Sequence, residues 1–142
     1  MDPIRTYLAL GTNLGDRQGN IDTAISLLEE ELGSPYIALS DIVETQAWGF
    51  VSTPFLNCVL SFDVCISPEE LLDVCKDVER RMGRTDPPEY DSSGNRIYHA
   101  RTIDVDILLY GDLTIDTERL TIPHPQIVTR PFIRPLLDQV IV

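Results

Sequence analysis

The spacing of apolar residues changes several times along the chain, and each change predicts a different structural element. Apolar runs at residues 6–11, 36–45 and 55–66 predict β-strands, and alternate residues of the third run are apolar. Over residues 21–32 and 71–82, apolar residues recur three or four positions apart, which predicts two amphipathic helices. The chain therefore opens as strand, helix, strand, strand, helix.

The ends of the predicted helices carry further signals. Before the second helix, Ser67 can cap the backbone, Pro68 fits the first helical position and Glu70 completes a capping box. Gly33 and Gly83 stand just past the last apolar positions, where helices commonly end. These signals support both helices independently of the apolar pattern.

A last strand is predicted at residues 103–110, within the stretch RTIDVDILLYG. Because successive side chains of a strand alternate between its two faces, Asp104 and Asp106 share one face. In a regular strand their Cβ atoms lie roughly 6.5 Å apart, so both carboxylates can reach a common ligand. Two negative charges this close repel each other, and we therefore expect a positive group beside them.

The order β, α, β, β, α, β is typical of the α+β, ferredoxin-like (split βαβ) fold, an antiparallel sheet with both helices packed on one face. We expect the other face to be open and to carry Asn57 with the two aspartates. Residues 84–100 lack periodicity and are rich in Pro, Gly, Ser and Asp, which predicts a long active-site loop. After the last strand, frequent prolines allow only short elements. A chain of this length predicts one domain, residues 1–142.

The composition excludes several classes of protein. The net charge of −12 argues against binding to nucleic acid or to an anionic membrane, since both need a broad basic surface. The three cysteines form no C-x-x-C, so neither a disulfide framework nor a zinc site is indicated. No apolar segment approaches the length that crosses a bilayer. We expect a soluble, cytoplasmic monomer with small-molecule partners.

Positive charge is concentrated in one part of the sequence. Ten of the eleven basic residues are arginines, and eight of these lie between residues 80 and 134. Arginine grips phosphate with a planar fork of donors, although any single arginine could equally pair with a surface acid. There is no G-x-x-x-x-G-K-[ST] phosphate loop, and Gly11 and Gly15 are interpreted as turn residues. Arginines, histidine and a metal on the aspartates would then hold a polyphosphate.

Five segments together carry a resemblance to a known family. They are ALGTNLGDRQGNI, FLNCVLSF, RRMGR, RTIDVDILLYG and ERLTIPHPQIVTRPFIRPL. In this order, over nearly the whole chain, they resemble the 6-hydroxymethyl-7,8-dihydropterin pyrophosphokinases of folate biosynthesis. The resemblance implies an enzyme that transfers pyrophosphate from ATP to the hydroxymethyl dihydropterin, giving AMP and the pterin diphosphate, with two Mg²⁺ ions as cofactors.

The resemblance also implies roles for individual residues. Asp104 and Asp106 match the acids that hold the two Mg²⁺ ions, and Arg84 and Arg101 match catalytic arginines that bind phosphate. The residues that match nucleotide contacts are Glu79, Ile107, Arg119, Thr121, His124 and Arg130. The residues that match the pterin pocket are Thr45, Phe55, Asn57 and Phe132, with Trp48 in a loop that closes over the substrates.

Two other functional classes fit parts of the pattern. A non-catalytic ferredoxin-like module could bind a nucleotide or a metal as a regulator without forming AMP. A two-metal phosphohydrolase would need more acidic or histidine ligands than this sequence offers. Among single residues, Phe55 and Phe132 could be core aromatics. For Trp48 we predict exposure that falls when both substrates bind.

Overall fold

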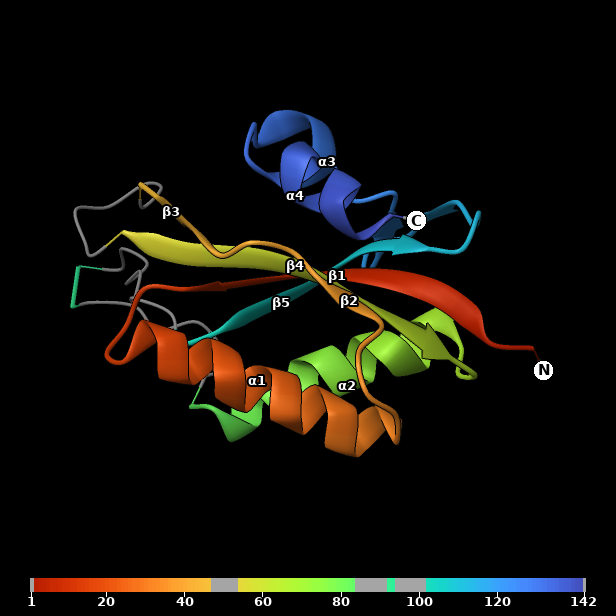
Figure 1. Cartoon of the computed structure of the whole chain (residues 1–142), viewed down its shortest axis with the longest axis horizontal. Coiled ribbons are helices and arrows are strands. Elements are labelled where there is room, and N and C mark those ends of the chain that lie inside the picture. The colour runs from red at the N-terminus through yellow and green to blue at the C-terminus, as the bar shows by residue number, and fades with distance from the viewer. Residues whose placement is uncertain (1, 47–53, 84–91, 94–101, 142) are drawn as a thin grey trace.

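The computed structural model describes residues 2–46, 54–83, 92–93 and 102–141 and has an α+β fold (Figure 1). Its main sheet is built on three long strands, β1 (Ile4–Thr12), β4 (Phe55–Val64) and β5 (Asp104–Tyr110). Two short strands, β2 (Ala38–Leu39) and β3 (Val43–Thr45), both pair with β4. The order is β2-β4-β1-β5 and every pair is antiparallel. The predicted ferredoxin-like class is confirmed.

Two helices, α1 (Arg17–Leu32) and α2 (Pro68–Arg81), lie side by side against one face of this sheet (Figure 1). The predicted capping box at the start of α2 is present, with Ser67 accepting from the Glu70 backbone N–H and Glu70 accepting from that of Ser67. Gly33 ends α1 in the left-handed conformation that glycine adopts without strain. No helix in the described ranges is long and apolar enough to cross a membrane.

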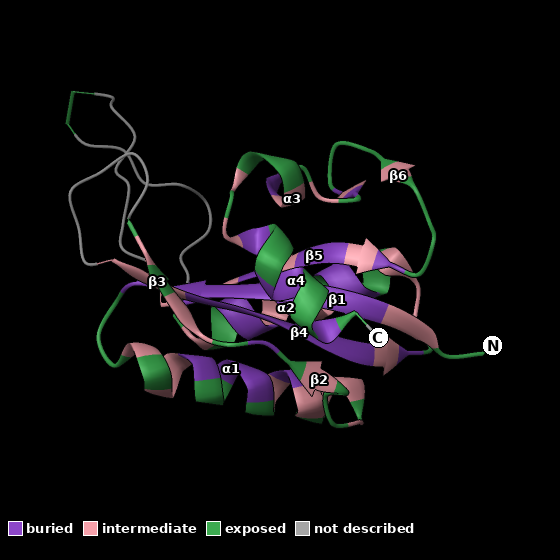
Figure 2. Cartoon of the chain, turned by 45° about the horizontal axis from the view of Figure 1, so that its top comes forward, coloured by how far each residue is buried: buried purple, intermediate pink, exposed green. Residues whose placement is uncertain are grey.

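The main core lies between the sheet and these two helices, whose outer sides are largely exposed (Figure 2). Alternate residues of β4 point into it, as the sequence predicts for the third apolar run. Burial of each large aliphatic or aromatic side chain contributes about 1.5–3 kcal/mol relative to exposure. Fully buried members of this core are Leu8, Ile21, Leu28, Leu60, Phe62, Leu71 and Ile107.

The opposite face is not open along its whole length, and this part of the sequence prediction is wrong. The short helices α3 (Gln126–Thr129) and α4 (Ile133–Val140) lie over it (Figure 1). α4 closes a second core with residues of β1, β4 and β5. Pro135 is tolerated in α4 because the first four N–H groups of a helix have no intrahelical partner. The buried members of this second core are Tyr7, Ala9, Val59, Leu108, Ile133, Leu136, Leu137 and Val140.

The strand predicted at residues 36–45 is interrupted. The Ser40 N–H donates to the Val59 carbonyl, but the Val59 N–H donates to the Ser40 hydroxyl, so a side chain replaces the backbone acceptor of the ladder. The next N–H, that of Asp41, donates to Gln139 on α4. The chain leaves the sheet there and rejoins it as β3.

A bulge in β5 corrects the predicted alternation at the end of this strand. Ile107 pairs with Leu8 and Leu109 pairs with Tyr7, which leaves Leu108 as an extra residue. Leu108 and Leu109 both contact the second core, whereas Tyr110 turns to the main core. Beyond β5, a two-stranded sheet of β6 (Ile115–Asp116) and β7 (Thr121–Ile122) leads to α3.

Candidate functional site

Two hollows flank the aspartate-bearing half of β5. We name them the strand hollow, which lies over β1, β4 and β5, and the edge hollow, which lies between β5, α2 and the segment around β7. The strand hollow is lined by Ala9, Leu10, Gly11, Phe55, Asn57, Asp104, Asp106, Gln126, Arg130 and Ile133. The edge hollow, of about 290 Å³, is lined by Leu72, Lys76, Val105, Asp106, Ile107, Glu118, Arg119, Leu120, Thr121, His124 and Pro125. Asp106 lines both.

Asp104 and Asp106 lie on the same face of β5, as the period-2 pattern predicts. In the sheet Asp104 is opposite Gly11 and Asp106 is opposite Ala9, and both aspartates are only partly exposed. Asp106 Oδ2 accepts a hydrogen bond of 3.1 Å from Gln126 Nε2. Small residues on β1 therefore leave room above two neighbouring carboxylates.

These carboxylates fit a magnesium ion by their chemistry. Mg²⁺ prefers oxygen ligands, keeps several waters and takes only one or two carboxylates, together with substrate phosphates. Among the described residues, no three acidic, histidine or cysteine side chains gather as a metal site. A pair of aspartates open to a hollow therefore suits an ion whose other ligands are water and phosphate oxygens.

Across β1 from Asp104, Asn57 is held in a fixed orientation. Its side chain is buried, and Nδ2 donates to Thr45 Oγ1 over 2.7 Å. A Cβ on Gly11 would lie 3.1 Å from Asn57 Oδ1 and 3.7 Å from the Phe55 ring. Gly11 lies within β1, paired with Asn57 and Asp104, so its interpretation as a turn residue is wrong. Its lack of a Cβ lets the Asn57 amide approach β1 closely.

Phe55 and Phe132 lie in different parts of the structure. Phe55 lines the strand hollow, whereas Phe132 caps the start of α4 and packs against the second core. The structure therefore brings Thr45, Asn57 and Phe55 together, and Phe132 lies beside the second core without lining either hollow.

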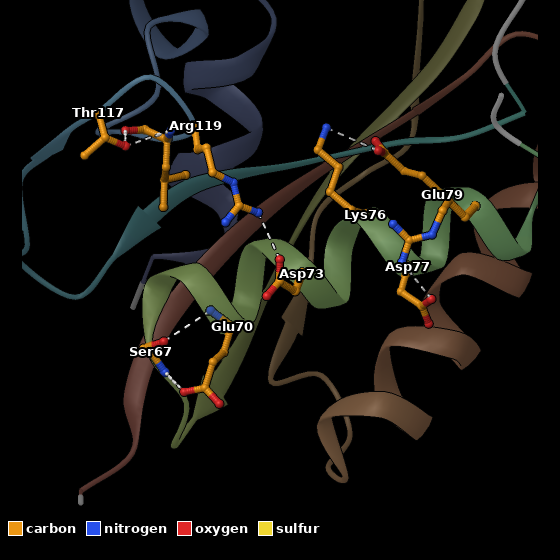
Figure 3. A network of polar contacts seen from close by, with 10 residues as sticks. Ser67, Glu70, Asp73, Lys76, Asp77, Glu79, Thr117 and Arg119 are labelled. Carbon is orange, nitrogen blue, oxygen red and sulfur yellow. Dashed lines mark hydrogen bonds and ion pairs between the residues drawn. The ribbon is translucent and has the colours of Figure 1, made fainter. Parts of the chain in front are cut away.

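In the edge hollow lie four of the six residues that match nucleotide contacts: Ile107, Arg119, Thr121 and His124. Arg119 Nη2 donates to Asp73 on α2 over 2.9 Å, and both side chains are more than half exposed (Figure 3). An exposed pair of this kind contributes at most about 1 kcal/mol. Arg119 can therefore exchange Asp73 for a phosphate at little cost.

Glu79 is buried beneath this hollow and does not line it. Its Oε2 accepts the Val105 N–H over 2.8 Å, and its Oε1 lies 3.5 Å from Lys76 Nζ (Figure 3). Val105 stands between the two aspartates on β5, so Glu79 fixes the backbone that carries them. Lys76 lines the edge hollow and was not among the predicted site residues.

His124 accepts a 3.1 Å hydrogen bond at Nδ1 from the Gln126 backbone N–H, so the neutral ring carries its proton on Nε2. Burial lowers the pKa of His124, and the positive charge of Arg130 lowers it further, whereas the negative charge of Asp106 opposes both. Arg130 itself lines the strand hollow, together with both aspartates. His124 therefore offers its Nε2–H as a donor to the edge hollow. Arg130 is a positive group in the hollow that Asp104 and Asp106 also line.

Three predicted site residues, Trp48, Arg84 and Arg101, lie outside the described residues. Sequence reasoning in turn missed Gln126, a buried residue that contacts Asp106. Its only sequence signal is its place two residues after His124, and nothing in the periodicity marks it as a neighbour of β5.

Comparison with known proteins shows which sequences this chain resembles. The sequence profile of the 7,8-dihydro-6-hydroxymethylpterin-pyrophosphokinase (HPPK) family matches residues 7–141. A 2-amino-4-hydroxy-6-hydroxymethyldihydropteridine pyrophosphokinase of Porphyromonas gingivalis is 39% identical over 93% of this chain and 88% of its own length. Enzymes of the same name from Aquifex aeolicus and Bacillus subtilis are 42% and 34% identical, over 93% and 89% of this chain and 78% and 72% of their own lengths.

Proposed function

The chain belongs to the 7,8-dihydro-6-hydroxymethylpterin-pyrophosphokinase family, and from this premise we propose that it transfers pyrophosphate from ATP to 6-hydroxymethyl-7,8-dihydropterin. The products are AMP and the pterin diphosphate, and the reaction is a step of folate biosynthesis. The observation that carries the proposal is the position of Asp106, which lines both hollows. One hollow would hold the pterin and the other the nucleotide, with the reacting phosphate between them.

The reaction needs little covalent participation by the protein. The hydroxymethyl oxygen forms a bond to the β-phosphorus of ATP, the bond from that phosphorus to the oxygen bridging the α-phosphate breaks, and the hydroxyl proton is lost. AMP leaves with the bridging oxygen. Holding two reactants in line can contribute about 7–11 kcal/mol to the barrier reduction, so binding each reactant in its own hollow is the main task of this chain.

We assign Asp104 and Asp106 to hold Mg²⁺, two ions in all, against the phosphates. Bound there, the ions would neutralise the phosphate charge and align the attacking and leaving oxygens. Arg130 lies in the same hollow and would bind phosphate oxygens with its fork of donors. By the family match, Arg84 and Arg101 would do the same.

On the pterin side, Asn57 would read the edge of the heterocycle with an amide whose orientation the Thr45 hydroxyl fixes. Phe55, from β4, offers a ring against which a flat heterocycle can stack. By the family match, Phe132 and Trp48 would also contact the pterin, although Phe132 lines neither hollow in this structure.

On the nucleotide side, Ile107 would contact the base and Thr121 the ribose or phosphates, while Arg119 and His124 would donate to phosphate oxygens. Glu79 is buried, so its assigned role is to support β5 beside the adenosine. We further propose that residues 1–142 act as one catalytic unit, monomeric and cytoplasmic. The free cysteines Cys58, Cys65 and Cys75 support this location, because unpaired thiols are typical of reducing compartments.

Product analysis tests the proposal. The protein is mixed with ATP, MgCl₂ and the hydroxymethyl dihydropterin, and the expected products are AMP and the pterin diphosphate in equal amounts. Without the pterin we expect no AMP, which separates the transferase from a phosphohydrolase. Binding of ATP with no AMP formed in the complete mixture would contradict the proposal and favour the regulatory module.

A further inference from the structure

Gln126 connects residues that belong to different parts of the proposed site. It is the first residue of α3, and only 6% of it is exposed. It lines the strand hollow, next to the aspartate that also lines the edge hollow. A buried amide side chain needs hydrogen-bond partners within the protein. The partners of Gln126 therefore show which groups its side chain orients.

Three polar groups of Gln126 form hydrogen bonds with three different residues of the site. Its side-chain Nε2 donates to Asp106 Oδ2 over 3.1 Å. Its backbone N–H donates to His124 Nδ1 over 3.1 Å. Its backbone carbonyl accepts from the Arg130 N–H over 3.0 Å. One residue thus contacts the Asp106 carboxylate, the His124 ring and the Arg130 backbone.

An amide suits the contact with Asp106 better than a charged side chain would. An arginine or lysine in this place would neutralise the carboxylate and compete with a bound cation, whereas an acid would repel it. The neutral amide uses one lone pair of Oδ2 and leaves the charge of Asp106 and the remaining lone pairs for a metal. Partners of this kind orient metal ligands, and their loss typically weakens metal binding or activity by 10–100-fold.

We propose that Gln126 is a positioning residue that holds the Asp106 carboxylate in the orientation that binds Mg²⁺. This inference rests on the proposed metal-binding role of Asp106. Gln126 comes from α3 and Asp106 from β5, so their hydrogen bond also fixes the distance between the two elements that border the strand hollow. The side chain acts through Asp106 and does not itself touch the phosphates.

Metal binding measured without turnover tests this role. Mn²⁺ replaces Mg²⁺ and is followed by electron paramagnetic resonance, with the α,β-methylene analogue of ATP present and the protein in excess over the nucleotide. The variant Gln126→Met keeps the length of the side chain and removes the donor. We expect its half-saturating Mn²⁺ concentration to rise about tenfold or more, while the affinity for the analogue without metal stays unchanged.

A second glutamine–aspartate pair supplies the matched control. Gln139 on α4 donates through Nε2 to Asp41 Oδ2 over 3.3 Å, on the surface and among none of the residues that line either hollow. Gln139→Met loses the same type of hydrogen bond, together with the bond that Gln139 Oε1 accepts from the Asp41 N–H. We expect it to bind Mn²⁺ as the wild type does. If Gln126→Met does not fold, Gln126→Ala carries the same test with a smaller side chain.

The outcomes separate the two proposals. If the wild type and Asp106→Asn bind Mn²⁺ equally, the metal assignment of Asp106 fails, and this inference fails with it. If Asp106→Asn loses the ion but Gln126→Met has the half-saturating concentration of Gln139→Met, only the positioning role is overturned. A lower melting temperature of Gln126→Met without a change in metal binding would likewise show a structural role alone.

Discussion

The sheet face turned away from α1 and α2 has two halves built on the same three strands. Beneath α4, β1, β4 and β5 contribute buried apolar side chains, namely Tyr7, Val59 and Leu108. Further along, the same strands line the strand hollow with Gly11, Asn57 and Asp104. Both halves therefore share one backbone scaffold but differ in what their side chains contact.

This difference separates stability from chemistry along each strand. The covered half removes apolar surface from water, which stabilises the fold. The hollow half keeps two like-charged, partly exposed carboxylates close together, which costs stability but leaves groups that can bind ligands. Substitutions in the covered half should then change the free energy of unfolding, and substitutions in the hollow half should change turnover.

The largest expected effect is on turnover, at the aspartates. Asp104→Asn and Asp106→Asn should each reduce kcat on the order of 10³-fold, or about 4 kcal/mol, because each loses a charged metal ligand. The free energy of unfolding should be unchanged or slightly higher, since carboxylate repulsion is relieved. Steady-state kinetics at saturating Mg²⁺ and urea unfolding measure the two quantities.

Asp63 supplies the control for this prediction. It lies on β4 opposite Arg5, with which it forms an ion pair away from the residues that line the hollows. Asp63→Asn should leave kcat at its wild-type value. Wild-type turnover in both Asp104→Asn and Asp106→Asn would contradict the assignment of a metal site to the hollow half.

The next largest effect is on stability, in the covered half. Leu137 of α4 is fully buried, so Leu137→Ala should lower the free energy of unfolding by about 2–5 kcal/mol through lost burial and a residual cavity. KM values for both substrates should stay unchanged at a temperature where the variant is folded. Val128→Ala, at a position 86% exposed on α3, should show almost no change. A large rise in either KM in Leu137→Ala would mean that the two halves are not separable.

A smaller effect, on KM for the pterin, is expected for a substitution at Gly11 in the hollow half. The added Cβ of Gly11→Ala would push on Asn57 Oδ1, so KM for the pterin should rise roughly tenfold through misplacement of the amide. Affinity for a nucleotide analogue in the edge hollow should be retained, and stability should not fall greatly, because Gly11 is not at a positive φ. Equal pterin KM values in variant and wild type would place the pterin elsewhere.

The smallest effect concerns the pH dependence of stability. Because burial lowers the pKa of His124, the unfolded chain takes up a proton more readily than the folded chain below the ordinary histidine pKa of about 6.5. The contribution of His124 to stability is thus full above that pH and is lost as pH falls toward the lowered folded-state pKa. His124→Asn should show a shallower fall in unfolding free energy between about pH 7 and pH 5.5. An identical slope in both proteins would contradict the burial of a neutral histidine.

Local sequence signals were sufficient for the elements that depend on local chemistry. Ser67, Pro68 and Glu70 specify the start of α2 by themselves, because each satisfies or spares a backbone group within one helical turn. The shared face of Asp104 and Asp106 likewise follows from the geometry of one strand. These features needed no knowledge of the rest of the fold.

The missed features depend on contacts between distant segments. Ile133, Leu136, Leu137 and Val140 have helical spacing, but two prolines hid this helix, and no local rule shows that it covers the sheet. The break at Ser40 requires Val59 as a partner, and the site role of Gln126 requires Asp106, twenty residues away. Such pairings are set by the tertiary structure, and a single sequence does not display them.

The bulge in β5 bears on how sequences of this fold can diverge. One residue inserted into a regular strand inverts the side of every residue after it, yet here Asp106 stays at the hollows and Tyr110 stays in the main core on either side of Leu108. The extra residue is put to use, because its carbonyl accepts the His124 N–H. A descendant that lost Leu108 could straighten the strand and keep both the acids and the tyrosine in place. Such a descendant would lose the hydrogen bond that holds the His124 backbone. A change in the length of a core strand would then alter nucleotide binding at the edge hollow.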